Sequence, residues 1–174
     1  MAEYTDPVLA YFITFSCYGS WLHGDARGSV DRKHHELGTP LLQPDEKRRE
    51  AMSQRMDQPP YSLDADRRRI VLQSIVEVCR FRHWHLLAAH VRSTHVHVVV
   101  HADETPERVM TAFKAYASRQ LNALKCDPKG RKRWTRHGST LYLKTDEQVS
   151  EKVRYVIFGQ GEAMAVYPHP NPAP

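Results

Sequence analysis

The segment STHVHVVVHA, residues 93–102, constrains the fold of this chain more than any other stretch of its sequence. Valine at this density predicts a buried β-strand, because β-branched side chains pack well on a pleated surface. Alternate residues of a strand point to the same side of a sheet, so His95 and His97 share one face with Val99. Two imidazoles held side by side on a strand are natural metal ligands. The alternative is a pair of histidines that are satisfied by hydrogen bonds or that face water at a sheet edge.

The flanking sequence supplies further helix and strand signals. Ile70, Val71 and Ile75 recur at helical spacing after Asp64, a candidate helix N-cap. Residues 105–107 (TPE) combine a capping hydroxyl, a proline at the first helical position and an acid in the first turn. Together with strand-like composition elsewhere, these signals predict strands at 8–19, 83–91, 95–102 and 139–144 and helices at 44–56, 64–82, 105–124 and 146–158.

The order of these elements predicts the ferredoxin-like split fold. When residues 19–63 and the last helix are set aside, the order is βαββαβ. We therefore expect an α+β fold, an antiparallel sheet with helices on one face, to which an N-terminal insertion at 19–63 and a C-terminal helix are added. The single domain would extend over residues 1–165, and the proline-rich residues 166–174 would form a loose tail.

Composition excludes several other classes of protein. The chain of 174 residues is 41% hydrophobic and 26% charged, as in ordinary globular domains. No apolar run approaches the roughly 20 residues of a membrane helix, and the N-terminus lacks the basic and apolar regions of a signal peptide. The three cysteines, Cys17, Cys79 and Cys126, have no metal or redox spacing. We therefore expect a protein of the reducing cytoplasm without a membrane partner.

Positive charge is concentrated in a few segments. The net charge is +5, and residues 125–137 (KCDPKGRKRWTRH) hold six basic residues against one aspartate. Further basic clusters lie at residues 47–49 and 67–69. Such clusters are typical of proteins that bind a polyanion such as nucleic acid. They are equally compatible with solvated faces, since Lys and Arg are rarely buried.

The helix predicted at 105–124 carries two residues that matter for the histidine pair. Tyr116 and Gln120 are four residues apart, so they lie on one face of the helix, one turn apart. In a split βαββαβ unit this helix packs on the sheet close to the histidine strand. Two imidazoles, an amide oxygen and a phenol would then converge on one site. Taken alone, Tyr116 is equally compatible with a core-edge aromatic residue and Gln120 with a solvated polar residue.

Five motifs, in this order, resemble a known family. They are Tyr11–Phe15 with the turn Gly19-Ser20, and the segments HVHVVV, FKAYASRQLN, WTRHGSTLYL and VRYVIFGQG. A strand with histidine–hydrophobe–histidine followed by a helix with one tyrosine resembles the HUH endonucleases. More closely, the set resembles the single-tyrosine transposases, in particular the REP-associated tyrosine transposases. One departure is the sequence Arg92-Ser93-Thr94 before the first histidine, where relatives often have Met-Pro-Asn or Met-Pro-Asp.

The resemblance implies a chemical role for each candidate residue. His95, His97 and Gln120 would hold Mg²⁺ or Mn²⁺, and imidazole ligands favour Mn²⁺ of the two. The metal would polarise a scissile phosphate. Tyr116 would be the nucleophile, and its attack would give a covalent 5′-phosphotyrosine and a free 3′-hydroxyl. The implied reaction is cleavage and strand transfer of single-stranded DNA at hairpin-flanked ends.

The resemblance also bears on partners and location. Some relatives dimerise and donate the tyrosine helix to the other subunit, while REP-associated relatives can act as monomers, so a homodimer stays open. The expected location is cytoplasmic, at the bacterial nucleoid. The expected partner is single-stranded or hairpin DNA.

The basic segment supplies most of the residues that we expect to hold this DNA. Trp134 lies among cations, and cations with an aromatic ring hold single strands by phosphate contact and base stacking. The alternative for Trp134 is a plug in the core. The predicted DNA-binding residues are Arg27, Lys129, Arg131, Lys132, Arg133, Trp134 and Arg136. Arg27 belongs to the insertion, where the motif resemblance suggests that GSWLHGDARGSVDR helps to read a short sequence beside a hairpin.

Other functions stay open on the same fold. A catalytically inactive or domesticated nucleic-acid-binding protein would bind DNA without forming a covalent adduct. A relaxase or replication initiator of the HUH type often has more histidines, a larger chain or paired tyrosines. The absence of paired cysteines disfavours a zinc-stabilised structural domain.

Overall fold

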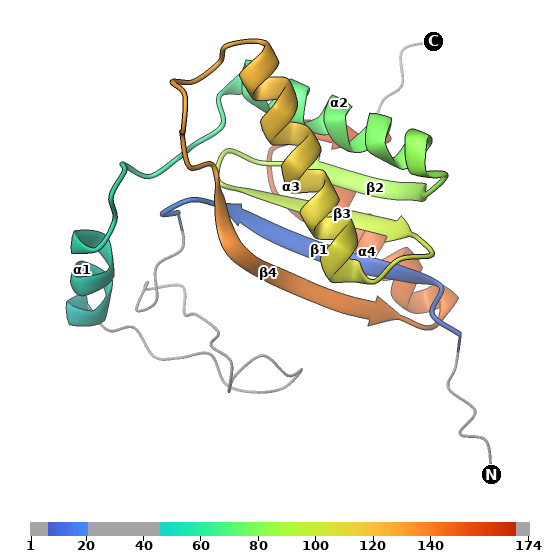
Figure 1. The fold of residues 1–174 in the computed structure, drawn as a ribbon. Helices are drawn as coiled ribbons and strands as arrows, with labels where there is room; N and C mark the ends of the chain where they lie inside the picture. The colour runs from blue at the N-terminus through green and yellow to red at the C-terminus, as the bar shows by residue number, and fades with distance from the viewer. Residues whose placement is uncertain (1–6, 21–45, 170–174) are drawn as a thin grey trace.

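One antiparallel sheet organises the residues that the computed structural model describes, 7–20 and 46–169 (Figure 1). Its five strands have the order β4-β1-β3-β2-β5, and every neighbouring pair is antiparallel. The strands are β1 (Ala10–Cys17), β2 (His85–Val91), β3 (His95–His101), β4 (Trp134–Leu143) and β5 (Ala165–Tyr167). The first four have the order 4-1-3-2 of the ferredoxin-like split unit, so the predicted α+β fold is confirmed.

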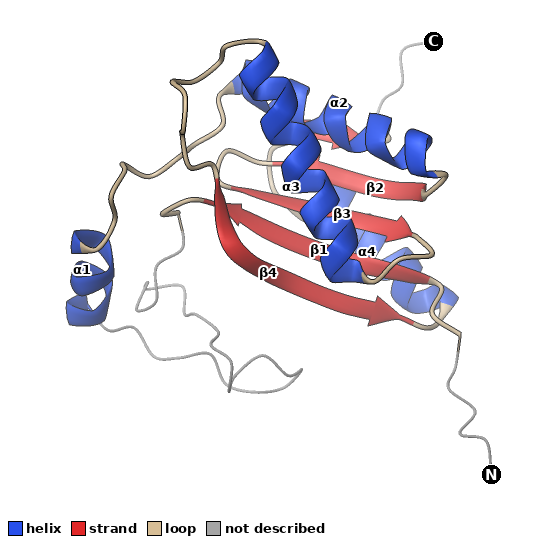
Figure 2. Ribbon diagram, viewed as in Figure 1, coloured by secondary structure: helices blue, strands red, loops and turns tan. Residues whose placement is uncertain are grey.

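Helices cover both faces of this sheet. Figure 1 shows α2 (Ala65–Arg82) and α3 (Pro106–Ala123) in front of the strands and α4 (Asp146–Phe158) behind them. The short helix α1 (Glu46–Gln54) lies beside the sheet rather than on it (Figure 2). The βαββαβ unit therefore has its two helices on one face, as predicted, and the added C-terminal helix occupies the other. None of the helices in the described ranges is long and apolar enough to cross a bilayer.

The alternation along β3 divides the core into two layers. Val96, Val98 and Val100 belong to the cluster that α2 and α3 cover, together with Phe113 of α3. Val99 belongs to the second cluster, which α4 covers. Successive side chains of a strand point to opposite faces, so both faces of β3 are buried by different helices. This explains the continuous valine run.

Local signals explain where the helices begin. Asp64 caps α2, since its carboxylate accepts a hydrogen bond from the Arg67 backbone amide at 2.8 Å. Thr145 caps α4 in the same way through the backbone amide of Gln148. Helix α3 begins at Pro106, whose missing amide hydrogen costs nothing at that position. The helices predicted at 64–82 and 146–158 are thereby confirmed within a residue.

Two strands differ from the prediction. β4 begins at Trp134 rather than at residue 139, because residues 134–138 pair with the end of β1 across a bulge. β5 lies partly in the segment 166–174 that we expected to be a loose tail. Its central residue, Val166, is buried between β2 and α4, and the free edge of β2 supplies the hydrogen-bonding partners. Residues 170–174 and the part of the insertion that contains Arg27 lie outside the described residues.

Candidate functional site

The histidine pair lies on the face of the sheet that α4 covers. Val99, the next residue on that face of β3, packs in the cluster beneath α4. The rings of His95 and His97 lie with their centroids 4.8 Å apart at an interplanar angle of 73°. His97 is 7% exposed, and the ring of Phe12 from β1 stacks on it at 5.6 Å. The predicted sharing of one strand face therefore produces two adjacent imidazoles at one end of the sheet.

His97 is held as a neutral imidazole. Burial lowers its pKa to about 3, and the neighbouring His95 and His90 add to this effect, while the side chain of Gln160 opposes it. The hydroxyl of Thr14, on β1, lies 2.7 Å from the Nδ1 atom of His97. A neutral imidazole with one nitrogen engaged by an outer partner is the form in which histidine binds a metal through its other nitrogen.

A tyrosine of α4 stands beside this pair. The ring centroid of Tyr155 lies 5.8 Å from that of His97 and 6.0 Å from that of Phe12. Tyr155 is 42% exposed, so its phenol is accessible from solvent. The ammonium of Lys152, one turn earlier on α4, lies 5.8 Å from the centre of the Tyr155 ring. The ring of Tyr155 thus lies beside His97 near the C-terminal end of α4, and the ammonium of Lys152 lies beside that ring.

The structure does not bring Tyr116 to the histidines. Tyr116 is on α3 and packs against the core cluster between α3, α2 and the sheet, on the opposite face. The guanidinium of Arg119 covers its ring at 4.2 Å. Gln120, one turn later, is exposed on the same helix. The expected convergence of these two residues with the imidazoles is therefore wrong for a single chain, because the sheet separates them.

The sequence itself indicates that Tyr116 lies on the face of the sheet away from the histidines. The apolar stripe of α3 must pack on the apolar side of β3, which the alternating valines identify as the side away from the histidines. A residue on the other face had to come from a different helix. The motif VRYVIFGQG, one of the five that resemble the family, contains Tyr155 and Gln160.

The donors at the histidine pair fit a divalent metal with open coordination positions. No group of three or more His, Cys, Asp or Glu residues that could hold a metal occurs within residues 7–20 and 46–169. At this site the donors are two imidazoles and the amide of Gln160, which interacts with His97. Three such donors on one divalent ion would leave coordination positions open for other ligands.

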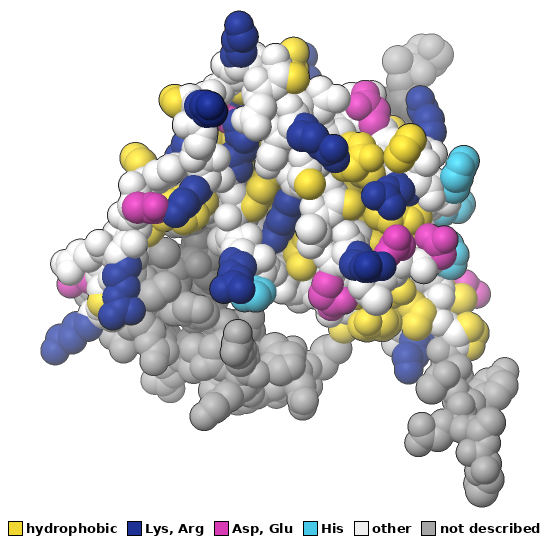
Figure 3. Space-filling view, in the orientation of Figure 1, with side chains coloured by type: hydrophobic (Ala, Val, Ile, Leu, Met, Phe, Trp, Pro, Cys, Tyr) yellow, Lys and Arg dark blue, Asp and Glu magenta, His cyan; other side chains and the backbone are white. Residues whose placement is uncertain are grey.

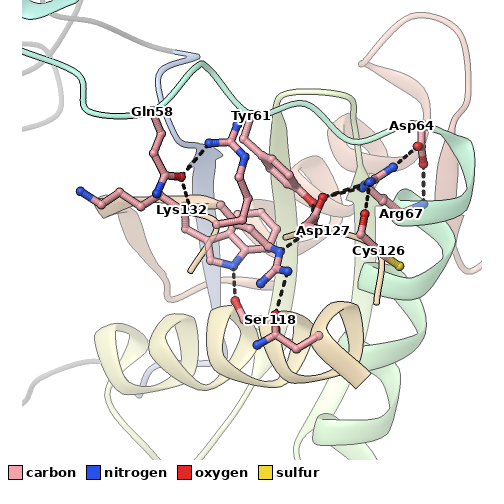
Figure 4. A network of polar contacts seen from close by, with 12 residues as sticks. Gln58, Tyr61, Asp64, Arg67, Ser118, Cys126, Asp127 and Lys132 are labelled. Atoms are coloured by element: carbon pink, nitrogen blue, oxygen red, sulfur yellow. Dashed lines mark hydrogen bonds and ion pairs between the residues drawn. The ribbon is translucent and has the colours of Figure 1, made fainter. Parts of the chain in front are cut away.

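The basic segment is largely built into the structure (Figure 4). Arg133 is 5% exposed and donates hydrogen bonds from Nε to Asp127 and from Nη2 to Asn122, both at 2.8 Å. Arg67 donates to the same carboxylate at 3.0 Å. Burial alone raises the pKa of Asp127, but hydrogen bonds from Arg133, Tyr61 and Arg67 outweigh it and the pKa is lowered. Arg133 is thus a core ion-pair partner, not the DNA contact that we expected.

Three further predicted DNA contacts are engaged within the protein. Trp134 donates from Nε1 to the Ser118 hydroxyl at 2.9 Å and packs edge-on against Phe15, which is the core-plug alternative. Arg131 donates to the carbonyls of residues 59 and 60, and Lys132 pairs with Asp57 at 2.5 Å. The contacts of Arg131 and Lys132 attach the segment 125–137 to the segment before α2.

Two predicted DNA contacts stay exposed. Among the predicted DNA-binding residues that the structure describes, Lys129 and Arg136 are exposed and have no role in the contacts above. Lys132 is also about half exposed, but it is paired with Asp57. Figure 3 shows Lys and Arg side chains dispersed over the face that carries α2 and α3 rather than gathered in one patch. The positive charge on this face is therefore dispersed. Among the described residues, Arg67, Lys132 and Arg133 are paired with carboxylates of the protein itself.

Comparisons with known proteins give a remote similarity. No family model matches the sequence, and no curated protein matches it significantly. Among solved structures, a REP-associated tyrosine transposase bound to a REP hairpin matches with a TM-score of 0.47 and 14% sequence identity. The match covers 91% of this chain and 72% of that chain. The relation concerns the fold and is distant.

Proposed function

We propose that this protein is a metal-dependent enzyme that cleaves and transfers single-stranded DNA at the histidine face beneath α4. The observation that carries the proposal is the position of Tyr155, whose ring lies 5.8 Å from that of His97. An accessible phenol beside two metal-competent imidazoles is the minimum set for attack on a phosphodiester by a covalent mechanism. The proposed nucleophile is thus Tyr155, in place of Tyr116.

The residues of this site would have two roles, metal binding and nucleophilic attack. His95, His97 and Gln160 would hold Mg²⁺ or Mn²⁺, which when bound neutralises charge on the scissile phosphate. The Tyr155 oxygen forms a bond to phosphorus, the bond from phosphorus to the 3′-oxygen breaks, and the 3′-hydroxyl takes up a proton. The product is a 5′-phosphotyrosine whose energy can be used to join a second DNA end.

The phenol proton must be removed for this attack. A free tyrosine loses its proton at about pH 10. The ammonium of Lys152 lies 5.8 Å from the centre of the Tyr155 ring. We infer that water accepts the proton.

A DNA substrate is supported by charge and by motif. The chain has a net charge of +5, which favours a polyanion. The segments HVHVVV and VRYVIFGQG, which supply the histidines, Tyr155 and Gln160, are among the motifs that resemble the single-tyrosine transposases. Exposed Lys129 and Arg136 are the candidate phosphate contacts that the structure leaves available.

The test is a covalent-adduct assay with a matched pair of tyrosine variants. Labelled single-stranded hairpin DNA is incubated with the protein and Mn²⁺, and the products are separated on a denaturing gel. We expect a protein–DNA adduct that disappears in Tyr155→Phe and persists in Tyr116→Phe. His97→Ala should lose the adduct while keeping most of the DNA affinity.

The other outcomes identify the rival functions. Loss of the adduct in Tyr116→Phe alone would mean that α3 is delivered by a second copy of the chain. Mixing Tyr116→Phe with His97→Ala would then restore the adduct. Binding of DNA by the wild-type protein without any adduct would contradict the enzymatic proposal and leave a nucleic-acid-binding protein on this fold.

A further inference from the structure

The segment 159–164, which joins α4 to β5, carries Gln160 to the histidine pair. This segment follows the helix that carries Tyr155 and precedes the short strand that pairs with the edge of β2. The position of this segment therefore decides whether the amide of Gln160 can bind the same metal ion as His95 and His97. Two side chains hydrogen-bond to this segment. They are His90 of β2 and Arg92, which follows the C-terminal end of β2.

His90 makes two hydrogen bonds to the elements on either side of this segment. Its Nδ1 atom lies 3.0 Å from the carbonyl oxygen of Val156, in the last turn of α4. The backbone amide of Met164 donates to its Nε2 atom at 3.2 Å. An amide can only donate, so Nε2 must carry the lone pair and the proton must be on Nδ1, which donates to the Val156 carbonyl. One imidazole thus binds the end of α4 and the beginning of β5 together.

A second contact holds the middle of the segment. Arg92, two residues further along, donates from Nη1 to the carbonyl oxygen of Glu162 at 2.6 Å. The strand β5 then pairs with β2, with Val166 opposite His90. The segment is consequently fixed at its start, middle and end by side chains and backbone of β2 and the residue that follows it.

His90 also lies directly beside the histidine strand. In the register of β2 and β3, His90 is opposite His97. His90 is fully buried, with 0% of its surface exposed, and both ring nitrogens are occupied. It is therefore not a metal ligand itself. Its strand pairs with β3, which carries the two imidazoles, and its ring bonds to α4 and to the segment that contains Gln160.

We propose that His90 is a positioning residue, which sets Tyr155 and Gln160 in register with the histidine pair by clamping the end of α4 to the start of β5. This inference rests on the proposed function. A buried polar group that satisfies two backbone groups from different elements fixes their relative position, because either group would otherwise be left buried and unpaired. Groups that orient metal ligands typically affect metal affinity by about 10–100-fold when they are replaced.

Two variants separate the parts of the clamp. His90→Phe keeps the size of the ring and loses both hydrogen bonds. His90→Asn has a shorter amide that reaches the position of Nδ1, so it keeps the bond to Val156 and releases Met164. The matched control is His85→Phe, which changes an exposed histidine at the other end of β2.

Two measurements are made on each folded protein, amide hydrogen exchange and Mn²⁺ affinity without DNA. We expect faster exchange of residues 159–164 in both His90 variants, while the amides of α4 keep their protection in His90→Asn. We expect Mn²⁺ affinity to fall about tenfold or more in His90→Phe and to stay unchanged in His85→Phe. In the adduct assay the rate at saturating DNA should fall, with little change in the DNA concentration that gives half the maximal rate.

The results distinguish failure of the inference from failure of the proposed function. Unchanged exchange of residues 159–164 in His90→Phe would overturn the clamp whether or not the protein is an enzyme. Faster exchange with wild-type Mn²⁺ affinity would show that the clamp is structural only, and the inference would be wrong. A wild-type protein that binds no Mn²⁺ and forms no adduct would refute the proposed function, and the inference with it.

Discussion

Arg133 offers a sharp test of the difference between a DNA contact and a core residue. Its side chain is 4% exposed, and that of its partner Asp127 is 6% exposed. Replacement by Met keeps an unbranched chain of comparable length but removes the charge. The variant Arg133→Met would leave the Asp127 carboxylate buried with fewer partners. We therefore expect a loss of stability and no direct effect on DNA binding.

The size of this loss follows from the contacts that remain. Breaking a buried ion pair by removing one partner costs about 3–5 kcal/mol. Asp127 would keep the hydrogen bond from Tyr61 at 2.8 Å and the ion pair with Arg67 at 3.0 Å. These partners place the expected cost at the lower end, about 3 kcal/mol. With a urea dependence of about 2 kcal/mol per molar, the unfolding midpoint would fall by about 1.5 M.

The assay is urea unfolding followed by circular dichroism, combined with DNA binding measured well below the unfolding midpoint. The matched control is Arg136→Met, which changes an exposed arginine three residues later. We expect the control to change stability by less than about 0.5 kcal/mol. It should weaken DNA binding and reduce its dependence on salt, as loss of one phosphate contact does. A negligible midpoint shift in Arg133→Met together with weaker DNA binding would refute the structural assignment.

Three further predictions address the metal site, an unusual lysine and a helix cap. Thr14→Val removes the hydroxyl beside His97 Nδ1, so Mn²⁺ affinity should fall by about tenfold or more in a calorimetric titration. Burial lowers the pKa of Lys114 to about 8 from 10.5. Between pH 8 and 10.5 the unfolded state holds a proton on Lys114 that the folded state has released, so the free energy of unfolding should rise with pH in this range. Urea unfolding measured across this range should show a smaller rise for Lys114→Met. Asp64→Ala removes the cap of α2 and should cost about 1 kcal/mol, measured by thermal unfolding.

Much of the fold could be predicted from local patterns. The helical spacing after Asp64, the proline at residue 106 and the valine alternation of β3 each depend on a few neighbouring residues, and the structure confirms all three. β5 and the first half of β4 could not be predicted in this way. Their strand conformation comes from pairing with β2 and β1, which are distant in sequence, and not from their own composition.

The candidate site was only half determined by its motifs. The pairing of His95 with His97 follows from strand geometry alone. The partner tyrosine does not, since Tyr116 and Tyr155 both lie in helices that follow the histidine strand in the chain. The choice depends on which face of the sheet each helix covers. That information was present only indirectly, in the match between the apolar stripe of α3 and the alternate valines.

The sequence by itself determined the elements, their order and the face of β3 on which the histidines lie, because strand and helix periods are properties of the local chain. Tertiary structure decided which side chains meet that face. It buried Arg133, packed Trp134 against the core, and brought Tyr155 and Gln160 to His97. The physical reason is that charge and aromatic character do not fix a residue's surroundings. Packing of α4 behind the sheet, and the hydrogen bonds of His90 that hold its end there, do so.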